Sequence, residues 1–178
     1  KSKPLYQRAL AIREISQGSE HPDVATALNN LALMYDATGD SARAEPLYQR
    51  ALSIREKTLG REHPLVADVL NNLAGLLSAT GSSAKAEPLH QQALEIREKA
   101  FGPVHPDVAA SLNSLADLYR AGGSFATAEP LYRRALAIRE KALGAEHPDV
   151  AATLNSLAEL HRAKGNGAQS EPLYRRAL

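Results

Sequence analysis

Apolar residues follow a helical spacing along most of the chain, and the pattern returns at a fixed interval. In the stretch 21–60, a first apolar stripe is spaced i, i+3, i+4 and i+7, as expected for one face of a helix. Its residues are Leu28, Leu31, Ala32 and Tyr35. A second stripe runs from 44 to 59, after Gly39. The pattern predicts a helix of about 16 residues, a short turn and an antiparallel helix of about 18 residues.

The same block recurs along the chain. His-Pro begins at 21, 63, 105 and 147, and Pro-Leu followed by Tyr or His begins at 4, 46, 88, 130 and 172, always 42 residues apart. A period of this length indicates stacked repeats. We therefore predict an all-α fold, an α-solenoid of antiparallel helix pairs that together form one domain. Its parts are the second helix of a partial repeat (1–20), repeats at 21–62, 63–104 and 105–146, and a truncated repeat at 147–178. Because the chain opens inside a repeat without an initiator Met, we expect a piece of a longer array.

Pro46 lies inside the predicted second helix, where proline removes the hydrogen bond to the carbonyl of residue i−4 and bends the helix. The helix could begin at Pro46 instead. We favour a start near Ser41, because Ala44 is in phase with the buried stripe. Asp40 or Ser41 would then cap the helix.

Composition narrows the class of partner. The chain has 178 residues, 21 Lys and Arg, 20 Asp and Glu, and a net charge of +1. This balance gives no electrostatic signal for nucleic acid or for an anionic membrane, and no apolar run is long enough to span a bilayer. The chain contains no cysteine. That composition fits a reducing compartment, and we expect a cytoplasmic protein.

The chain has six histidines, which are candidate metal ligands, but we expect all of them to have structural roles. The boundary residues His21, His63, His105 and His147 are a whole helix pair apart, farther than one zinc ion can bridge. His90 and His161 replace tyrosines of the apolar stripes and should be buried. The chain also lacks phosphate-loop, nucleophile-elbow and zinc-protease motifs. We predict no enzymatic activity, no metal and no cofactor.

The repeated pattern L-x-x-L-A-x-x-Y, then G, then A-x-x-x-Y-x-x-A resembles the tetratricopeptide repeat. The usual unit has about 34 residues, and the longer unit here is similar to the arrays of kinesin light chain and kinesin-light-chain-like bacterial proteins. The matching words are LNNLA at 28–32 and 70–74, LNSLA at 112–116 and 154–158, and ALxIREK before LG or FG and HP. The resemblance implies a right-handed superhelix whose concave groove is lined by the first helices and binds a protein segment.

The face of the first helices opposite the core is where the repeats differ from one another. Positions equivalent to Leu28, Leu31 and Ala32 are constant, whereas those equivalent to 26, 30, 33 and 36 mostly vary. A variable face on a constant scaffold is a candidate for binding, although it could also be ordinary solvated surface. The candidate residues on it are Asn30, Leu33, Asp36, Asp68, Asn72, Ser114, Asp117, Arg120, Ser156, Glu159 and Arg162.

One asparagine recurs in every repeat at the edge of this face, at Asn29, Asn71, Asn113 and Asn155. An amide offers two donors and one acceptor, so a row of amides could hold the backbone of an extended peptide. The family resemblance implies that role. The alternative, equally weighted, is that each asparagine bridges to the next first helix and fixes the stacking.

The leading hypothesis is therefore a scaffold that binds an extended or helical protein segment. The alternatives are self-assembly through uncapped terminal helices and service as the recognition arm of a larger multidomain protein. Leu5, Tyr6 and Leu10 at one end, and Leu173, Tyr174 and Leu178 at the other, should be partly uncovered.

Overall fold

Each His-Pro pair opens a first helix. The computed structural model describes residues 3–178, and its first helices are α2 (Pro22–Asp36), α4 (Pro64–Ala79), α6 (Pro106–Ala121) and α8 (Pro148–Ala163). Proline suits the first turn because its missing N–H would have no intrahelical partner there. The preceding histidine is the N-cap, and its Nδ1 accepts the backbone N–H two residues on, at 3.1–3.2 Å in all four cases. The boundary histidines thus cap the start of each first helix.

The second helices contain the recurring proline. They are α1 (Lys3–Gln17), α3 (Ser41–Leu59), α5 (Ser83–Phe101), α7 (Phe125–Leu143) and α9 (Gly167–Arg176). The start of α3 at Ser41 confirms the early start, with Pro46 inside the helix. The prediction that a side chain caps α3 is wrong. Asp40 is the N-cap but makes no capping hydrogen bond, and its carboxylate lies 3.5 Å from Nε of Arg43 instead.

Glycine ends the long second helices. Gly60 has φ 85° and ψ 154° after α3, and Gly144 has φ 89° and ψ 155° after α7. This region of backbone space is open essentially to glycine alone. The chain can therefore leave each second helix abruptly and reach the next His-Pro pair in a short loop.

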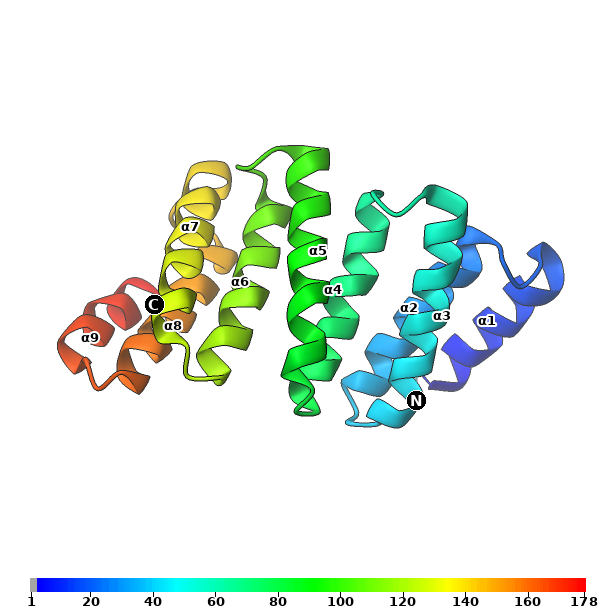
Figure 1. Cartoon of the computed structure of the whole chain (residues 1–178), viewed down its shortest axis with the longest axis horizontal. Coiled ribbons are helices and arrows are strands. Elements are labelled where there is room, and N and C mark those ends of the chain that lie inside the picture. Colours follow the sequence, from blue (N-terminus) through cyan, green and yellow to red (C-terminus); the bar gives the residue numbers. More distant parts are fainter. Residues whose placement is uncertain (1–2) are drawn as a thin grey trace. The chain divides into compact units, whose positions relative to one another are not determined.

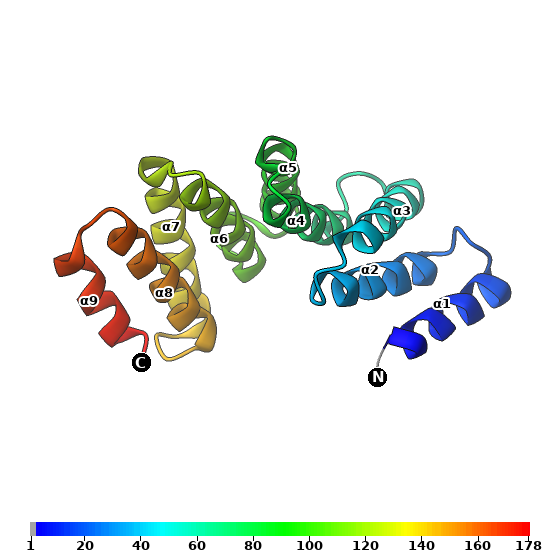
Figure 2. The ribbon, with the colours of Figure 1, turned by 90° about the horizontal axis from the view of Figure 1, so that it is seen from below.

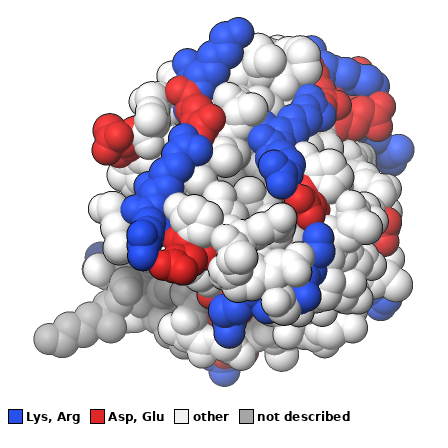
Figure 3. Space-filling view, turned by 90° about the vertical axis from the view of Figure 1, so that its left-hand side faces the viewer, with Lys and Arg blue, Asp and Glu red and all other residues white. Residues whose placement is uncertain are grey.

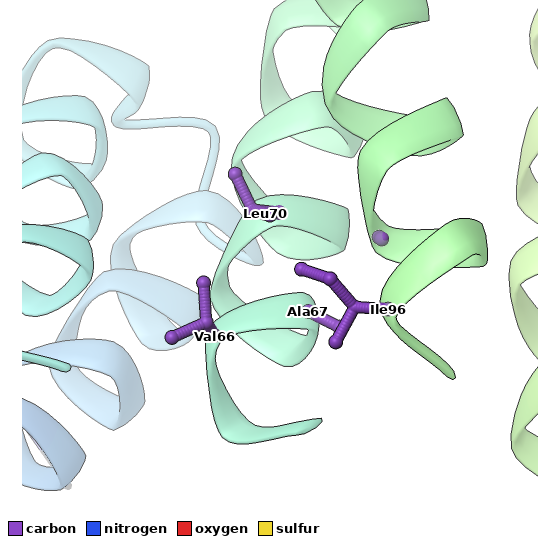
Figure 4. Packing of buried hydrophobic residues seen from close by; sticks show 5 residues of the cluster. Val66, Ala67, Leu70 and Ile96 are labelled. Carbon is purple, nitrogen blue, oxygen red and sulfur yellow. The ribbon is translucent and has the colours of Figure 1, made fainter. Parts of the chain in front are cut away.

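The chain divides into two compact units, Lys1–Ile96 and Arg97–Leu178. In the first unit α1 packs on α2, α2 on α3 and α3 on α4, and the first helices α2 and α4 also touch (Figures 1 and 2). Part of its core lies where α4 meets α5. There Val66, Ala67 and Leu70 of α4 cluster with Ala93 and Ile96 of α5, and Figure 4 shows Ile96 directed at Ala67.

The second unit repeats this arrangement from the end of α5 to α9. Helix α6 packs on α7, α7 on α8 and α8 on α9, while the first helices α6 and α8 touch. Its core cluster comprises Ala116, Ala128, Tyr132, Leu157 and Leu160. All regular secondary structure within residues 3–178 is helical, and the paired packing confirms the predicted α-solenoid class.

Successive second helices are also joined by an ion pair on their outer surface. An arginine of one second helix reaches the glutamate 36 positions earlier, in the second helix before it. These pairs are Arg50–Glu14 (2.6 Å), Arg134–Glu98 (2.6 Å) and Arg176–Glu140. The equivalent positions in α3 and α5 are Glu56 and Gln92, so this particular ion pair is replaced at that step.

His90 and His161, the two polar residues of the apolar stripes, are buried as predicted, since each is only 2% exposed.

Charges on the surface are mixed in sign. Figure 3 shows Lys and Arg interleaved with Asp and Glu on the side of the second unit where α9 lies. None of the helices in the described part of the chain is long and apolar enough to cross a bilayer.

Candidate functional site

We use the term first-helix face for the arc formed by Thr26, Asn30 and Leu33 of α2 and by its C-cap Ala37, with Asp36 at the edge, together with their counterparts at intervals of 42 residues. Thr26, Asn30, Leu33 and Ala37 are exposed. They step around the helix within one narrow arc, away from the buried Leu28 and Leu31. Within each unit, the first helices therefore present side chains that the core does not use.

The candidate residues differ in their exposure. Asn29 is buried, at 8% exposed. Four residues are exposed, namely Asn30, Leu33, Asn155 and Arg162. The others are half-buried, namely Asp36, Asp68, Asn71, Asn72, Asn113, Ser114, Asp117, Arg120, Ser156 and Glu159.

The recurring asparagines have different surroundings in different repeats. The Oδ1 of Asn29 accepts a hydrogen bond from Nδ2 of Asn72 at 3.1 Å, which bridges α2 to α4. The Oδ1 of Asn71 lies 2.9 Å from Nδ1 of His90. Asn155 is exposed. In the first unit Asn29 thus fixes the stacking of neighbouring first helices, whereas Asn155 presents its amide to solvent.

Charged residues on the first-helix face of the second unit are held by tyrosines of the second helices. The hydroxyl of Tyr132 donates to Oδ1 of Asp117 at 2.5 Å, and Nε of Arg120 donates to the same hydroxyl at 3.2 Å. Nδ2 of Asn113 donates to the other carboxylate oxygen at 3.0 Å. Both oxygens of Asp117 therefore have donors within the protein, and its charge lies beside the guanidinium of Arg120, 3.5 Å away.

The next repeat contains a matching cluster. The hydroxyl of Tyr174 donates to Oε1 of Glu159, and Nη2 of Arg162 donates to Oε2 at 2.7 Å. These hydrogen bonds, that from Arg162 first, lower the pKa of Glu159. The second unit thus presents two acid–arginine–tyrosine clusters one repeat apart.

The first repeat lacks such a cluster because Leu33 occupies the position of the acid. The hydroxyl of Tyr48, the counterpart of Tyr132, is consequently buried without a hydrogen-bond partner. On the surface, Leu33 is 42% exposed. With Tyr6, Asn30 and Met34 it lines a shallow pocket of about 430 Å³. The first-helix face is apolar here and charged in the second unit.

This contrast predicts opposite results for the same substitution. Tyr132→Phe should lower the free energy of unfolding by about 1 kcal/mol, because Asp117 and Arg120 lose a partner. Tyr48→Phe should leave it unchanged or raise it slightly, since that hydroxyl has no partner to lose. Urea denaturation of the two variants would measure the difference. Equal losses would contradict the assigned hydrogen bonds.

Three buried arginines were given no role by the sequence analysis. Arg55, Arg97 and Arg139 are 5%, 8% and 9% exposed. Each donates from Nη1 to a backbone carbonyl of the following first helix, 10 positions later. The signal for them was the IRE triplet, which recurs unchanged at 12–14, 54–56, 96–98 and 138–140, although a freely solvated arginine would not need to be constant.

In the described part of the chain, no three His, Cys, Asp or Glu side chains lie close enough together to hold a metal ion.

Comparison with known proteins identifies the family. Four overlapping matches to the family model described as Tetratricopeptide repeat cover residues 1–57, 39–99, 65–141 and 107–178. Among curated proteins, none matches the chain.

Solved structures share the fold over almost the whole chain. BtubC (BKLC) from P. vanneervenii is 30% identical with a TM-score of 0.83, covering 98% of this chain and 70% of that one. A putative kinesin light chain with nearly identical TPR-like repeats from Podosopora anserina is 31% identical with a TM-score of 0.77, covering 98% and 83%. A Rap protein complexed with Competence and Sporulation Factor has a TM-score of 0.85 at 19% identity, covering 98% and 46%, which shows a common fold.

These similarities confirm the resemblance to kinesin-light-chain-like arrays. The family matches together span residues 1–178, and the first helices begin at Pro22, Pro64, Pro106 and Pro148, one 42-residue period apart. This chain belongs to the tetratricopeptide repeat family.

Proposed function

We propose that the chain binds a segment of a partner protein along the first-helix face. Membership of the tetratricopeptide repeat family indicates a protein-interaction scaffold. The first-helix face is the surface that we propose the partner contacts. The observation that carries it is the first-helix face, where the side chain changes from Leu33 to Gly75, Asp117 and Glu159 at equivalent positions that are exposed or half-buried. A constant scaffold that presents different side chains in each repeat is suited to recognising an extended or helical segment, because each repeat can contact different residues of it.

The two units would contact different parts of such a segment. The shallow pocket of Leu33 and Met34 suits an apolar side chain. In the second unit both acids of the face are already paired with Arg120 and Arg162, so they do not offer bare negative charge to the partner. The exposed amides of Asn30 and Asn155 are the groups best placed to hydrogen-bond its backbone.

A peptide library displayed on phage, followed by affinity measurement on a selected peptide, tests the proposal. Changing Asn30→Ala, Leu33→Ser and Asn155→Ala together should weaken binding about tenfold or more, because each removes a contact without touching the core. The matched control is Gln49→Ala with Gln91→Ala, two exposed positions on the second helices. Equal affinity of the face variant and the unaltered chain would refute this binding surface.

A second candidate function, association of two copies of this chain, is favoured by the apolar surface of α1. Ile12 is 56% exposed, whereas its counterpart Ile54 is 1% exposed beneath its first helix. Leu5 and Ile15 are also uncovered, at 67% and 87%. Light scattering across a concentration series would test it, with Ile12→Glu expected to abolish association. A monomer at every concentration would exclude it.

The cytoplasmic location expected from the sequence remains a prediction.

A further inference from the structure

The sequence contains a single Asn-Gly pair, Asn166 and Gly167, where the turn after α8 meets the start of α9. Asparagine followed by glycine loses its side-chain amide more readily than other asparagine pairs, because glycine has no Cβ atom to shield the next backbone nitrogen. Both residues are exposed. The pair lies outside the first-helix face, so a modification there is independent of the binding function proposed above.

The reaction needs only these two residues and water. The backbone nitrogen of Gly167 attacks Cγ of Asn166 and forms an N–Cγ bond. The bond from Cγ to the amide nitrogen breaks, and ammonia leaves with the proton of the attacking N–H. Water then opens the five-membered imide at either carbonyl. The product at position 166 is aspartate or isoaspartate, and isoaspartate continues the main chain through its own Cβ and Cγ.

The structure holds the pair in a conformation that cannot react. Asn166 is the N-cap of α9, with φ −92° and ψ 64°, and its side chain makes no capping hydrogen bond. At this ψ the Cβ atom of an L residue lies almost opposite the next nitrogen about the Cα–C bond. Cγ is therefore turned away from the nitrogen of Gly167, and the imide ring cannot close until the backbone of Asn166 rotates.

Backbone hydrogen bonds of the first turn of α9 maintain this conformation. The carbonyl of Asn166 accepts from the N–H of Gln169 at 3.1 Å and from the N–H of Ser170 at 3.2 Å. The N–H of Asn166 donates to the carbonyl of His161 at 2.9 Å. Rotation about the Cα–C bond of Asn166 moves its carbonyl away from both donors in α9. The reaction therefore requires the first turn to open.

Helix α9 is weakly held, which makes this opening accessible. It has 10 residues, and Ser170 is the buried one, whereas α7 of the same unit buries Ala128, Tyr132, Ala135, Ile138 and Arg139. It packs on α8 (Figure 2). Segments with few buried contacts open locally at a lower free energy than the whole domain. We therefore expect α9 to open without unfolding of the rest of the unit.

We propose that Asn166 is a deamidation site gated by the opening of α9. The rate in the folded chain is then the rate in the open turn multiplied by the fraction of time that the turn is open. The two products differ in their effect on the fold. Asp40 is the N-cap at the equivalent position ahead of α3, so aspartate fits this turn and leaves it intact.

Isoaspartate would keep α9 from closing again. Its former backbone carbonyl carbon becomes a free carboxylate that is no longer bonded to Gly167, and the main chain gains one carbon atom. The acceptor for the first turn is thereby separated from the helix that it starts. Tyr174 of α9 then loses its position beside Glu159. One acid–arginine–tyrosine cluster of the second unit would be lost as a result.

Mass spectrometry with peptide mapping, after incubation at mildly alkaline pH, measures both products at position 166. Deamidation should be at least about tenfold faster in guanidinium chloride than in buffer, because the turn is then always open. Gly167→Ala should slow the reaction in guanidinium chloride severalfold, and its Cβ atom meets nothing within 4 Å in the fold. Equal rates in the two solutions would rule out the gate. Absence of isoaspartate in guanidinium chloride would rule out the site.

Two leucine variants test whether α9 is the gate. Leu173→Ala removes a half-buried side chain that packs on the core of the second unit. It should raise the rate in buffer about fivefold or more and leave the rate in guanidinium chloride unchanged. Leu178→Ala, at an exposed leucine, is the matched control and should alter neither rate. A Leu173→Ala rate in buffer no higher than that of the unaltered chain overturns the inference.

Hydrogen exchange measures the consequence for the fold. The purified isoaspartate form should lose protection of the α9 amides. Asn166→Asp, which supplies the other product, should keep that protection. Equal protection in the two forms would show that isoaspartate does not prevent α9 from closing.

Discussion

Arg139→Met should lower the free energy of unfolding of the second unit by about 2–3 kcal/mol, because the guanidinium makes two buried hydrogen bonds that methionine cannot replace. Nη1 donates to the backbone carbonyl of Asp149 at 3.0 Å and to Oγ1 of Thr153 at 2.5 Å. Both acceptors belong to α8, the first helix of the next repeat. Methionine keeps much of the side-chain volume, so the loss reports the hydrogen bonds rather than a cavity.

Urea denaturation, with hydrogen exchange to localise the loss, would measure this effect. Arg133→Met is the matched control, since Arg133 is an exposed arginine of the same helix paired with Glu129, worth a few tenths of a kcal/mol. A loss in Arg139→Met no larger than in the control would show that the buried arginine does not join the repeats. The same change at Arg55 should cost less, because Val69 stands where the next two repeats have Ser111 and Thr153.

Gly144→Ala should destabilise the chain by about 1–3 kcal/mol through the backbone alone. The residue adopts φ 89° and ψ 155° at the end of α7, a conformation that costs a residue with a Cβ atom this amount. A Cβ atom at Gly144 would meet no atom within 4 Å. Crowding therefore contributes nothing, and only the conformation of the backbone is tested.

The control for this prediction has the opposite sign. Gly75 lies within α4, is exposed, and also has open space around an added Cβ atom. Gly75→Ala should stabilise the chain by about 0.5–1 kcal/mol, because alanine loses less entropy than glycine in a helix. Thermal and urea denaturation would compare the two variants. A Gly144→Ala variant as stable as Gly75→Ala would contradict the assigned loop conformation.

Most of the fold could be predicted from the sequence because its signals are local and repeated. His-Pro marks the start of each first helix, and the phase of Ala44 correctly placed the start of α3 ahead of Pro46. His90 and His161 were correctly assigned to the core, since they occupy positions of the apolar stripe. The capping of α3 by Asp40 was wrong, because the carboxylate pairs with Arg43 instead.

The site could be predicted less completely, because its chemistry depends on contacts between helices. Asp117 and Glu159 were identified as charged residues of the first-helix face. Their partners, Tyr132 and Tyr174, lie 15 positions later on another helix, and no periodicity within one helix reveals such a bond. The apolar groove lined by Leu10, Leu31, Pro46 and Leu47 was missed for the same reason. Pro46 was recognised as a break in one helix, but the groove needs α1, α2 and α3 together.

The ion pairs between successive second helices have a mechanical consequence. Their side chains are 31–51% exposed, and salt weakens attraction between exposed charges. Where Gln92 replaces the arginine, this ion pair is missing from the step between α3 and α5. We therefore expect added salt to loosen the steps that carry the ion pair more than it loosens the step from α3 to α5.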